Sequence, residues 1–447
     1  MKNNEVLQGI CVDYTYDGQG IVKINNEVIF VPGLLKDEVA DIQIIYRKKN
    51  FCVGKIKKII KLSPFRIKPK CSVSTSCGGC CFQNLKYDEQ ISIKVNYVNQ
   101  LLKRVAKIEN KVQNFIKMDN PYYFRNKIQV PFGYDKQHRL IYGFYKSKTH
   151  DIVYNKECVI QDKRASEILN TLQKLFLDFK IPAYDEDKRS GFIRHVLIRT
   201  SYYLNQVMVV LITNELEFKN KNNFIKELIK IHPEITTIIQ NINKRDTNVI
   251  LGDKEIILYG KGYIEDKLCD LKFKISSKSF FQTNVIQTEK LYNLAINLAN
   301  LNKNDNVLDC YCGTGTIGLI ASKYVKNVTG VEIVKEAIKD AINNAKENNI
   351  NNVKFICEDA KNYLVNKDID VIFVDPPRKG LDKNFIDSIL KNKPKKIVYI
   401  SCDPATLARD LNILKEIYNI SDINCVDMFP FSFHVETICA LSFKGPK

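Results

Sequence analysis

The sequence contains no apolar stretch long enough to cross a membrane, and its first residues lack the apolar segment of a signal peptide. No run in the 447 residues approaches the roughly 20 apolar residues that a membrane-spanning helix needs. Residues Met1–Gln8 are polar, which predicts that no secretory leader is present. We therefore expect a cytoplasmic protein without membrane contact, in which cysteines stay reduced.

Acidic residues are scarce relative to basic ones. The chain has 50 Asp and Glu against 68 Lys and Arg, a formal charge of +18. This excess suits a polyanionic partner such as nucleic acid, although a general bias towards lysine produces the same charge. Residues 42–70 are more informative, because they hold ten Lys or Arg and no acid. We interpret this segment as an RNA-contacting face; the alternative is a strand edge protected by lysine.

The fourteen cysteines cannot be a disulfide framework in a reducing compartment, so clustered ones indicate metal binding or catalysis. Cys71, Cys77 and Cys80 form a C-x5-C-x2-C pattern, and Cys158 follows far downstream; Cys81 is an adjacent spare. Four thiolates could bind zinc or a [4Fe–4S] cluster, or remain free. The second close pair typical of zinc sites is missing, which favours the cluster.

The chain shows neither internal repeats nor low-complexity linkers, but its pattern changes along its length. Short apolar runs in residues 6–60 predict a small barrel of OB type. Residues 85–107 have helical periodicity and could pack on the catalytic domain, and residues 120–270 alternate as an α+β unit. From about residue 275, strands and helices alternate, which predicts a doubly wound, Rossmann-like α/β sheet. The predicted domains are residues 1–62, 63–270 and 271–447.

A strand that runs into a glycine-rich turn and then a helix marks a nucleotide-type site at Asp309–Thr316. Gly313 and Gly315 allow the backbone to approach a ligand closely. The third glycine of the dinucleotide pattern is misplaced, so the turn is a poor pyrophosphate site. The form D-x-x-x-G-x-G is similar to the first motif of S-adenosylmethionine (SAM) methyltransferases. Glu332 ends the next strand, where a carboxylate can accept both ribose hydroxyls of an adenosine.

Two further acids follow predicted strands. Asp359 lies just after the third strand of the sheet, where an acceptor for the adenine edge would sit. Asp375 begins Asp-Pro-Pro-Arg378 directly after an apolar strand. An acid at the carboxyl end of a parallel strand points into the ligand crevice.

Cys402 lies between a buried strand and a helix that starts at Pro404. A thiol near a helix N-terminus is placed where the dipole and free N–H groups favour the thiolate, so we predict a nucleophile there. Glu436 is a carboxylate inside the apolar terminal strand. Partial burial raises the pKa of such a group, and it could act as a base.

Together these motifs resemble the RNA uracil-C5 methyltransferases. The resemblance covers nearly the whole chain and points to the branch that modifies 23S ribosomal RNA. It implies an N-terminal TRAM domain, SAM as cofactor and a [4Fe–4S] cluster on Cys71, Cys77, Cys80 and Cys158. The sequence does not show the oligomeric state, and we expect a monomer. The matching stretches are Phe280-Phe-Gln-Thr-Asn284, Asp309–Gly315, Asp375–Arg378, Ser401-Cys-Asp-Pro-Ala-Thr-Leu-Ala-Arg409 and His434-Val-Glu-Thr437.

Residue by residue, the resemblance makes Cys402 the nucleophile and Glu436 the base, and Arg125–Lys127 an RNA-facing stretch. The turn glycines Gly313 and Gly315 would lie against the cofactor. The residues that would contact SAM are Gln282, Tyr311, Glu332, Asp359, Asp375 and, in second rank, Thr316.

Three alternatives remain at this stage. A transfer-RNA enzyme of the same family would typically lack the TRAM domain and the cluster. An adenine amino-methyltransferase would carry an aromatic residue where Arg378 stands, and would not need Cys402. A non-enzymatic iron–sulfur RNA-binding protein would not need Glu332, Asp375 and Cys402 in register.

Overall fold

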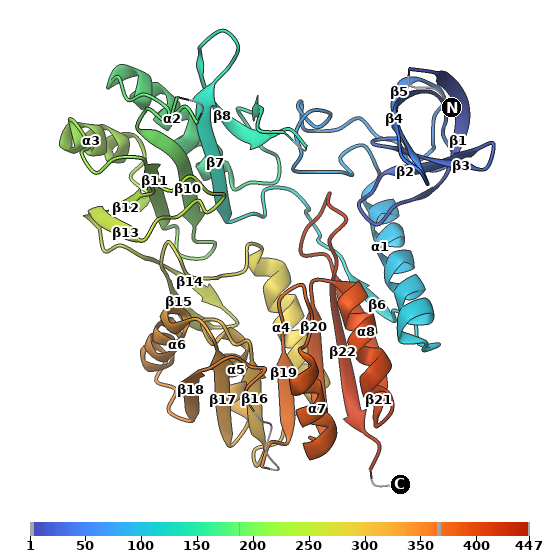
Figure 1. The fold of residues 1–447 in the computed structure, drawn as a ribbon. Coiled ribbons are helices and arrows are strands. Elements are labelled where there is room, and N and C mark those ends of the chain that lie inside the picture. The colour runs from blue at the N-terminus through green and yellow to red at the C-terminus, as the bar shows by residue number, and fades with distance from the viewer. Residues whose placement is uncertain (1–3, 148, 187, 364–367, 446–447) are drawn as a thin grey trace.

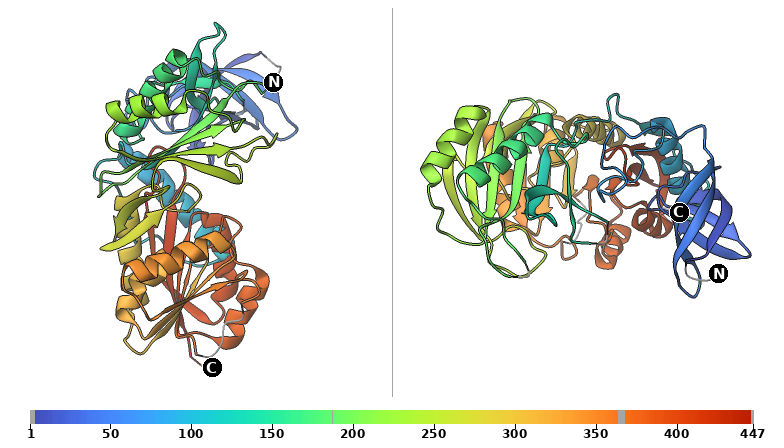
Figure 2. Two further views of the ribbon diagram at one scale, coloured as in Figure 1. Left: turned by 90° about the vertical axis from the view of Figure 1, so that its left-hand side faces the viewer. Right: turned by 90° about the horizontal axis from the view of Figure 1, so that it is seen from above.

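The computed structural model describes residues 4–147, 149–186, 188–363 and 368–445. The chain forms a β-barrel, a central sheet and a larger α/β unit (Figure 1). Seen from above, the barrel and the central sheet lie on opposite sides of the molecule (Figure 2). No helix in the described ranges is long and apolar enough to span a bilayer.

The predicted small barrel is confirmed: five strands close in the order β1-β2-β3-β5-β4. Its interior is filled by alternate apolar side chains such as Val22, Ile29 and Ile42, as the period of two in a strand requires. The basic residues of segment 42–70 are mostly exposed; Arg66 instead pairs with the buried Glu38. The strands are β1 (Val6–Tyr14), β2 (Gly20–Ile24), β3 (Glu27–Val31), β4 (Val39–Arg47) and β5 (Cys52–Lys61).

After the barrel, the chain first joins the α/β unit. Helix α1 (Tyr87–Leu101) ends in a π-helical turn (Leu102–Ala106). Val98, Leu102 and Ala106 share one core cluster with residues of the C-terminal helices. Strand β6 (Asn114–Ile116) then pairs with the edge of the C-terminal sheet. The segment that links the barrel to the central unit, residues 87–116, is therefore part of the C-terminal α/β unit.

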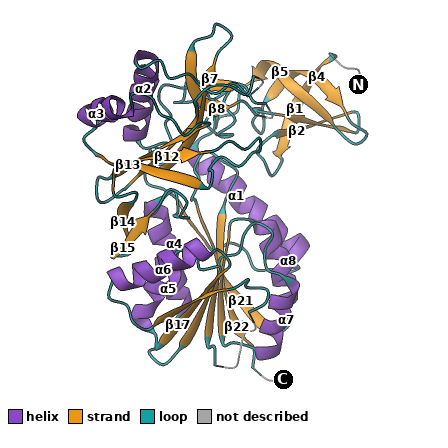
Figure 3. Cartoon of the chain, turned by 60° about the vertical axis from the view of Figure 1, so that its left-hand side comes forward, coloured by secondary structure: helices purple, strands orange, loops and turns teal. Residues whose placement is uncertain are grey.

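The central unit is a seven-stranded sheet of order β13-β12-β11-β10-β7-β8-β9, with helices α2 and α3 on its outer face (Figure 3). Strands β10 and β11 are buried along their whole length. One face packs under the helices, and the other shares a core with the α/β unit. The elements are β7 (Lys127–Tyr134), β8 (Leu140–Tyr145), β9 (Ile152–Tyr154), α2 (Lys163–Asp178), β10 (Ile193–Thr200), β11 (Val207–Thr213), α3 (Lys221–Ile231), β12 (Ile235–Ile242) and β13 (Lys254–Gly260).

A β-hairpin joins the central and C-terminal units. Its strands, β14 (Ile264–Leu268) and β15 (Leu271–Ile275), pair directly, and the predicted boundary at residue 270 falls in their turn. Ile264 and Phe273 contribute to the core that the two units share. The hairpin therefore belongs to both units rather than to either one.

The predicted doubly wound sheet is confirmed in the C-terminal unit. Eight strands lie in the order β18-β17-β16-β19-β20-β22-β21-β6. Strands β18 to β20 are parallel, and β22 is antiparallel to both neighbours. The elements are α4 (Val285–Ala299), β16 (Asn306–Cys310), α5 (Thr316–Ala321), a 3-10 turn (Ser322–Tyr324), β17 (Asn327–Glu332), α6 (Lys335–Glu347), β18 (Val353–Cys357), β19 (Val371–Val374), α7 (Lys383–Asn392), β20 (Lys396–Ser401), α8 (Pro404–Leu414), β21 (Tyr418–Val426) and β22 (Glu436–Phe443).

Helices cover both faces of this sheet (Figure 3). One core contains residues of α4, α5 and α6, and the other contains residues of α1, α7 and α8. Burial on both faces explains why the central strands read as continuous apolar runs.

A buried ion pair connects α1 to the segment after β21. Lys94 Nζ donates to Asp427 Oδ1 at 2.7 Å and to the Phe429 carbonyl at 3.2 Å. Both charged side chains are almost fully buried. The Tyr87 hydroxyl donates to the second carboxylate oxygen at 2.7 Å. Each of the four groups therefore has at least one partner within the protein.

Replacing Lys94 by methionine should lower the free energy of unfolding by about 3–5 kcal/mol, because Asp427 then keeps a buried charge without its partner. The exposed pair Lys117–Asp88 provides the matched control, since Lys117→Met should cost at most about 1 kcal/mol. Urea denaturation followed by circular dichroism measures both. Equal decreases in the free energy of unfolding of the two variants would show that the buried pair stabilises the fold no more than the exposed pair does.

Candidate active site

A pocket lies at the carboxyl ends of β16 and β19. This is where a doubly wound sheet binds its ligand. Five of the predicted cofactor residues line it: Gln282, Tyr311, Gly313, Thr316 and Asp375. Sequence reasoning gave no role to the other lining residues, which are Leu268, Phe280, Phe281, Tyr292, Asp309, Cys312, Thr314 and Ile317.

The glycine-rich turn after β16 has an uncommon backbone path. Tyr311, Gly313 and Gly315 all have positive φ angles, of 61°, 54° and 80°. A Cβ on Gly313 would meet no atom within 4 Å, so this backbone faces open space. A Cβ on Gly315 would stand 2.8 Å from the Phe355 ring. Gly315 thus permits helix–strand packing, whereas Gly313 leaves room for a ligand.

Glu332 and Asp359 lie beside this turn, outside the lining of the pocket. The two carboxylate oxygens of Glu332 accept from the backbone N–H groups of Gly313, at 3.1 Å, and Val334, at 2.9 Å. Asp359 forms an ion pair with Lys361 at 3.0 Å, and that bond holds its pKa below the usual value. Glu332 is therefore positioned by the same turn that carries Gly313.

Buried polar groups support the opposite wall. The hydroxyl of the buried Tyr292 interacts with the side chains of Gln282 and Thr316. Asn126 Nδ2 donates to the Gln282 carbonyl at 3.1 Å, and its own N–H donates to the Thr283 carbonyl. Asn126 is buried, so it supports the pocket from the central unit instead of facing outward as predicted. Tyr292 had shown no signal in the sequence beyond helical periodicity.

Cys402, Asp375 and Glu436 form one group at the end of the sheet. Ser401 pairs with Thr437 across the antiparallel strands β20 and β22. Continuing this register by one residue places Cys402 opposite Glu436. The charges of Glu436, Asp375 and Arg378 all act on the Cys402 thiol.

The electrostatics of this group differ from the prediction for Cys402. Burial, and then the two carboxylates, raise the pKa of the thiol to about 11. The free N–H groups of helix α8 are not available to the sulfur, because the Asp403 side chain accepts from Ala405 and Thr406. Cys402 is therefore a protonated thiol at rest, and the predicted stabilisation of its thiolate by the helix is wrong.

The carboxyl groups are also shifted towards protonation. Burial raises the pKa of Asp375 to about 7. Burial and the charge of Asp375 raise the pKa of Glu436 well above its ordinary value. Two like charges this close oppose each other's ionisation, so the pair retains a proton near neutrality.

Helix α8 holds the Asp-Pro-Pro-Arg loop in place. Arg409 Nη2 donates to the carbonyls of Lys379, at 3.0 Å, and Leu381, at 3.3 Å. The Thr406 hydroxyl donates to the Arg378 carbonyl at 3.2 Å. Buried Asp410 accepts from the Leu381 N–H at 2.9 Å. The side chains after Cys402 thus act as positioning residues for the loop that carries Asp375.

The four predicted metal-ligating cysteines line a second cavity, of about 40 Å³. N–H groups point at three of their sulfurs: Gly79 to Cys77 at 3.4 Å, Gln83 to Cys80 at 3.7 Å, and Asn155 to Cys71 at 4.0 Å. The lining also includes Ser74, Arg125, Phe144, Cys158, Val159 and Ile160. Among the described residues, no three His, Cys, Asp or Glu side chains stand close enough together to hold a single metal ion.

Phe431 connects the cysteine segment to the active site. Its carbonyl accepts from the N–H groups of Cys81, at 2.9 Å, and Phe82, at 3.1 Å. Its own N–H donates to the buried Gln90 side chain at 3.1 Å. Its ring packs in one cluster with Cys71, Cys80 and Cys158. Phe431 lies five residues before Glu436, so the segment that leads to the predicted base is hydrogen-bonded to the cysteine segment.

The high pKa of Cys402 predicts slow alkylation of the free protein. Iodoacetamide labelling of this thiol should accelerate about tenfold per pH unit from about pH 7 to about pH 9, because the thiolate fraction rises tenfold for each unit below the pKa. Peptide mass spectrometry gives the rates, with the exposed Cys357 as a control for reagent access. A labelling rate for Cys402 that levels off below about pH 9 would contradict the raised pKa.

Comparisons with known proteins place the chain in a family. Residues 86–444 match the family described as tRNA (Uracil-5-)-methyltransferase. An uncharacterized RNA methyltransferase of Staphylococcus aureus (strain MSSA476) is 42% identical over 99% of both chains. One of Clostridium tetani is 44% identical over 96% of this chain and 95% of its own.

A solved structure agrees with these matches. The Pyrococcus abyssi tRNA (uracil-54, C5)-methyltransferase, in complex with S-adenosyl-L-homocysteine, superposes with a TM-score of 0.80 at 28% identity. The alignment covers 97% of this chain and 100% of that one. The chain therefore belongs to the RNA uracil-5-methyltransferase family of SAM-dependent enzymes.

Proposed function

We propose that this enzyme methylates C5 of a uridine in 23S ribosomal RNA, with Cys402 as nucleophile and Glu436 as base. The observation that carries the proposal is the meeting of Cys402, Asp375 and Glu436 at one edge of the sheet, next to the pocket. An adenine amino-methyltransferase would have no use for a thiol in that group. A non-enzymatic RNA-binding protein would have no use for the pocket.

Uracil C5 is too weak a nucleophile to take a methyl group unaided. Attack of the Cys402 sulfur on C6 forms an S–C6 bond and sends electron density to C5, while the thiol proton passes to Asp375. The raised pKa of the thiol makes that proton acceptor necessary. The positive charge of SAM, when bound, would favour loss to solvent of the proton that the carboxyl pair holds at rest, so that Glu436 stays ionised for the later step. SAM, when bound, supplies the methyl group as an electrophile.

Completion of the reaction needs a base. After C5 has gained the methyl group, the Glu436 carboxylate removes the C5 proton, the C5=C6 double bond re-forms, and the S–C6 bond breaks. The sulfur leaves as a thiolate and takes back the proton held by Asp375, which regenerates the Cys402 thiol, and the proton that Glu436 took from C5 is released to solvent. A base in a buried, partly apolar setting has the raised pKa that proton abstraction near neutral pH requires.

The predicted cofactor residues would hold SAM as follows. Gln282, Tyr311, Gly313 and Thr316 would contact it inside the pocket, and Asp375 would face its methionine end or the uracil edge. Outside the lining, Glu332 would accept the ribose hydroxyls and Asp359 the adenine edge. Gly315 would contribute only by letting the turn close.

Cys71, Cys77, Cys80 and Cys158 would hold a [4Fe–4S] cluster. Two observations fit such a group: four sulfurs surround one cavity, and N–H donors reach three of them. Hydrogen bonds to the sulfurs are a regular feature of iron–sulfur sites. The cluster has no redox task in methyl transfer, so we assign it a structural role through Phe431.

A transfer-RNA substrate is the second candidate. The Pyrococcus abyssi enzyme, which acts on tRNA by its name, aligns over its whole length with this chain. The barrel and the cysteine segment therefore do not by themselves distinguish ribosomal from transfer RNA. The resemblance of the motifs supports ribosomal RNA.

Transcripts containing 5-fluorouridine test both the chemistry and the substrate. Fluorine at C5 cannot leave as a cation, so with SAM the wild-type enzyme should form an adduct with 23S ribosomal RNA that survives denaturing gels. Cys402→Ala should form none. Glu436→Gln should accumulate adduct even on unmodified uridine, because elimination is blocked.

Three outcomes would overturn parts of this proposal. An adduct in Cys402→Ala would remove this residue as nucleophile. Normal turnover by Glu436→Gln would remove the base. Adducts with transfer-RNA transcripts instead of ribosomal ones would make the second candidate correct.

The cluster has an independent test. After anaerobic purification, the wild-type protein should show the broad visible absorption of iron–sulfur proteins, near about 400 nm. Cys77→Ser should lose it, and Cys81→Ser should retain it, because Cys81 does not line the cavity. A colourless wild-type protein, or one that contains zinc, would refute the cluster.

A further inference from the structure

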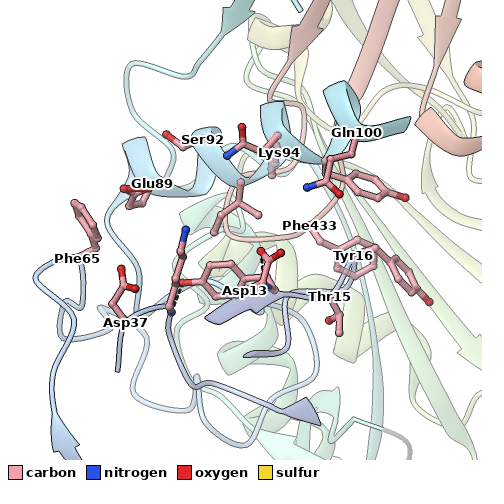
Figure 4. A pocket seen from close by; sticks show the side chains of 15 residues that line it. Asp13, Thr15, Tyr16, Asp37, Phe65, Glu89, Ser92, Lys94, Gln100 and Phe433 are labelled. Atoms are coloured by element: carbon pink, nitrogen blue, oxygen red, sulfur yellow. Dashed lines mark hydrogen bonds between the residues drawn. The ribbon is translucent and has the colours of Figure 1, made fainter. Parts of the chain in front are cut away.

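A cleft of about 190 Å³ lies between the barrel and helix α1 (Figure 4). One wall is the β1–β2 turn of the barrel and the other is the exposed face of α1. Phe433, from the segment before β22, closes one end. The lining residues are Asp13, Tyr14, Thr15, Tyr16, Lys36, Asp37, Phe65, Glu89, Ser92, Ile93, Lys94, Asn96, Tyr97, Gln100 and Phe433.

The closed end of this cleft adjoins the candidate active site. The ring of Phe433 lies 4.2 Å from the ring of His434. His434 Nε2 is 3.4 Å from Arg378, which acts on the Cys402 thiol. On the α1 side, burial and then the charge of Asp403, the residue after Cys402, raise the pKa of Tyr97. A nucleotide next to a uridine bound at Cys402 would therefore lie at or in this cleft.

The lining of this cleft suits a base better than a phosphate. At its closed end Tyr16, which is 66% exposed, meets Phe433 edge-on at 6.0 Å, and exposed rings offer stacking surfaces to any base. Along the rest of the cleft, three carboxylates (Asp13, Asp37 and Glu89) face two cations, Lys36 and Lys94, and Lys94 is already paired with Asp427. Carboxylates repel phosphate but accept hydrogen bonds from the N–H groups of bases.

The cleft continues into a second cavity with the opposite charge. The two share Asp13, Lys36, Asn96 and Gln100. The second is lined further on by exposed cations of the π-helical turn and the loop after it, Lys103, Arg104 and Lys111, with Glu109 as the added acid. Cations along a groove bind the phosphates of a single strand.

We propose that this continuous groove binds the single-stranded RNA next to the target uridine. The neighbouring base stacks at Tyr16 and Phe433, and the backbone then follows α1 to the basic π-helical turn. This inference rests on the proposed function, since it assumes that the target base enters at Cys402.

Transcripts with 2-aminopurine at single positions flanking the target test the proposal. On binding to the full-length enzyme, the fluorescence of the base that stacks in the cleft should be quenched, at one side of the target only. Phe433→Ala and Tyr16→Ala should each relieve that quenching and weaken RNA binding about tenfold, the loss expected for one stacked base. Tyr324→Ala removes an exposed ring remote from the groove and should change neither.

Lys103→Ala/Arg104→Ala should weaken binding without relieving the quenching, and should reduce its salt dependence. All variants should bind S-adenosyl-L-homocysteine as the wild type does, which shows that they are folded. Unchanged quenching in both aromatic variants, or quenching at no flanking position, would overturn the proposal. If the wild type also fails to trap 5-fluorouridine RNA, the proposed function fails; if trapping is normal, only the groove assignment fails.

Discussion

The buried pair of Lys94 and Asp427 is the interaction on which the position of helix α1, and of the barrel that precedes it, depends. Two charges removed from water are tolerated only when both are fully hydrogen-bonded. Here 333 residues separate the partners. The pair fixes α1, which follows the barrel, against the segment that leads to β22, and the Asp427 carbonyl also accepts from Gln287 of α4. The barrel thereby acquires a defined position beside the active site.

The chemistry of the site follows from the strand order. Parallel strands β19 and β20 deliver Asp375 and Cys402 at their carboxyl ends, and antiparallel β22 delivers Glu436 at its start. All three groups therefore meet at one edge of the sheet, in a setting that keeps protons bound. Entry of a cationic ligand such as a sulfonium would lower the pKa of these carboxyls. Binding of such a cofactor would therefore convert a protonated carboxyl of this group into a carboxylate that can accept a proton.

Much of this could be predicted from the sequence, because local patterns determine local structure. The strand, glycine turn and helix around Gly313 follow directly from residue order, and so do the positions of Asp375 and Cys402 after apolar strands. The rest depends on contacts between distant segments. No local pattern shows that Asn126 would support Gln282, or that Tyr292 would bridge Gln282 and Thr316. The thiol pKa was mispredicted because burial and the charges of Glu436 and Asp375, which come from other strands, raise it, while Asp403 accepts the helix N–H groups.

The attachment of Phe431 to the cysteine segment has a consequence for biosynthesis. Cys81 and Phe431 are 350 residues apart, so at typical translation rates tens of seconds, roughly, separate their emergence from the ribosome. For most of that interval all four cysteines and the rest of the cavity lining, which lies within residues 71–160, are already made but lack the backbone partner and the ring of Phe431. The contacts that attach the cysteine segment to the strand carrying Glu436 can form only when the end of the chain has been synthesised.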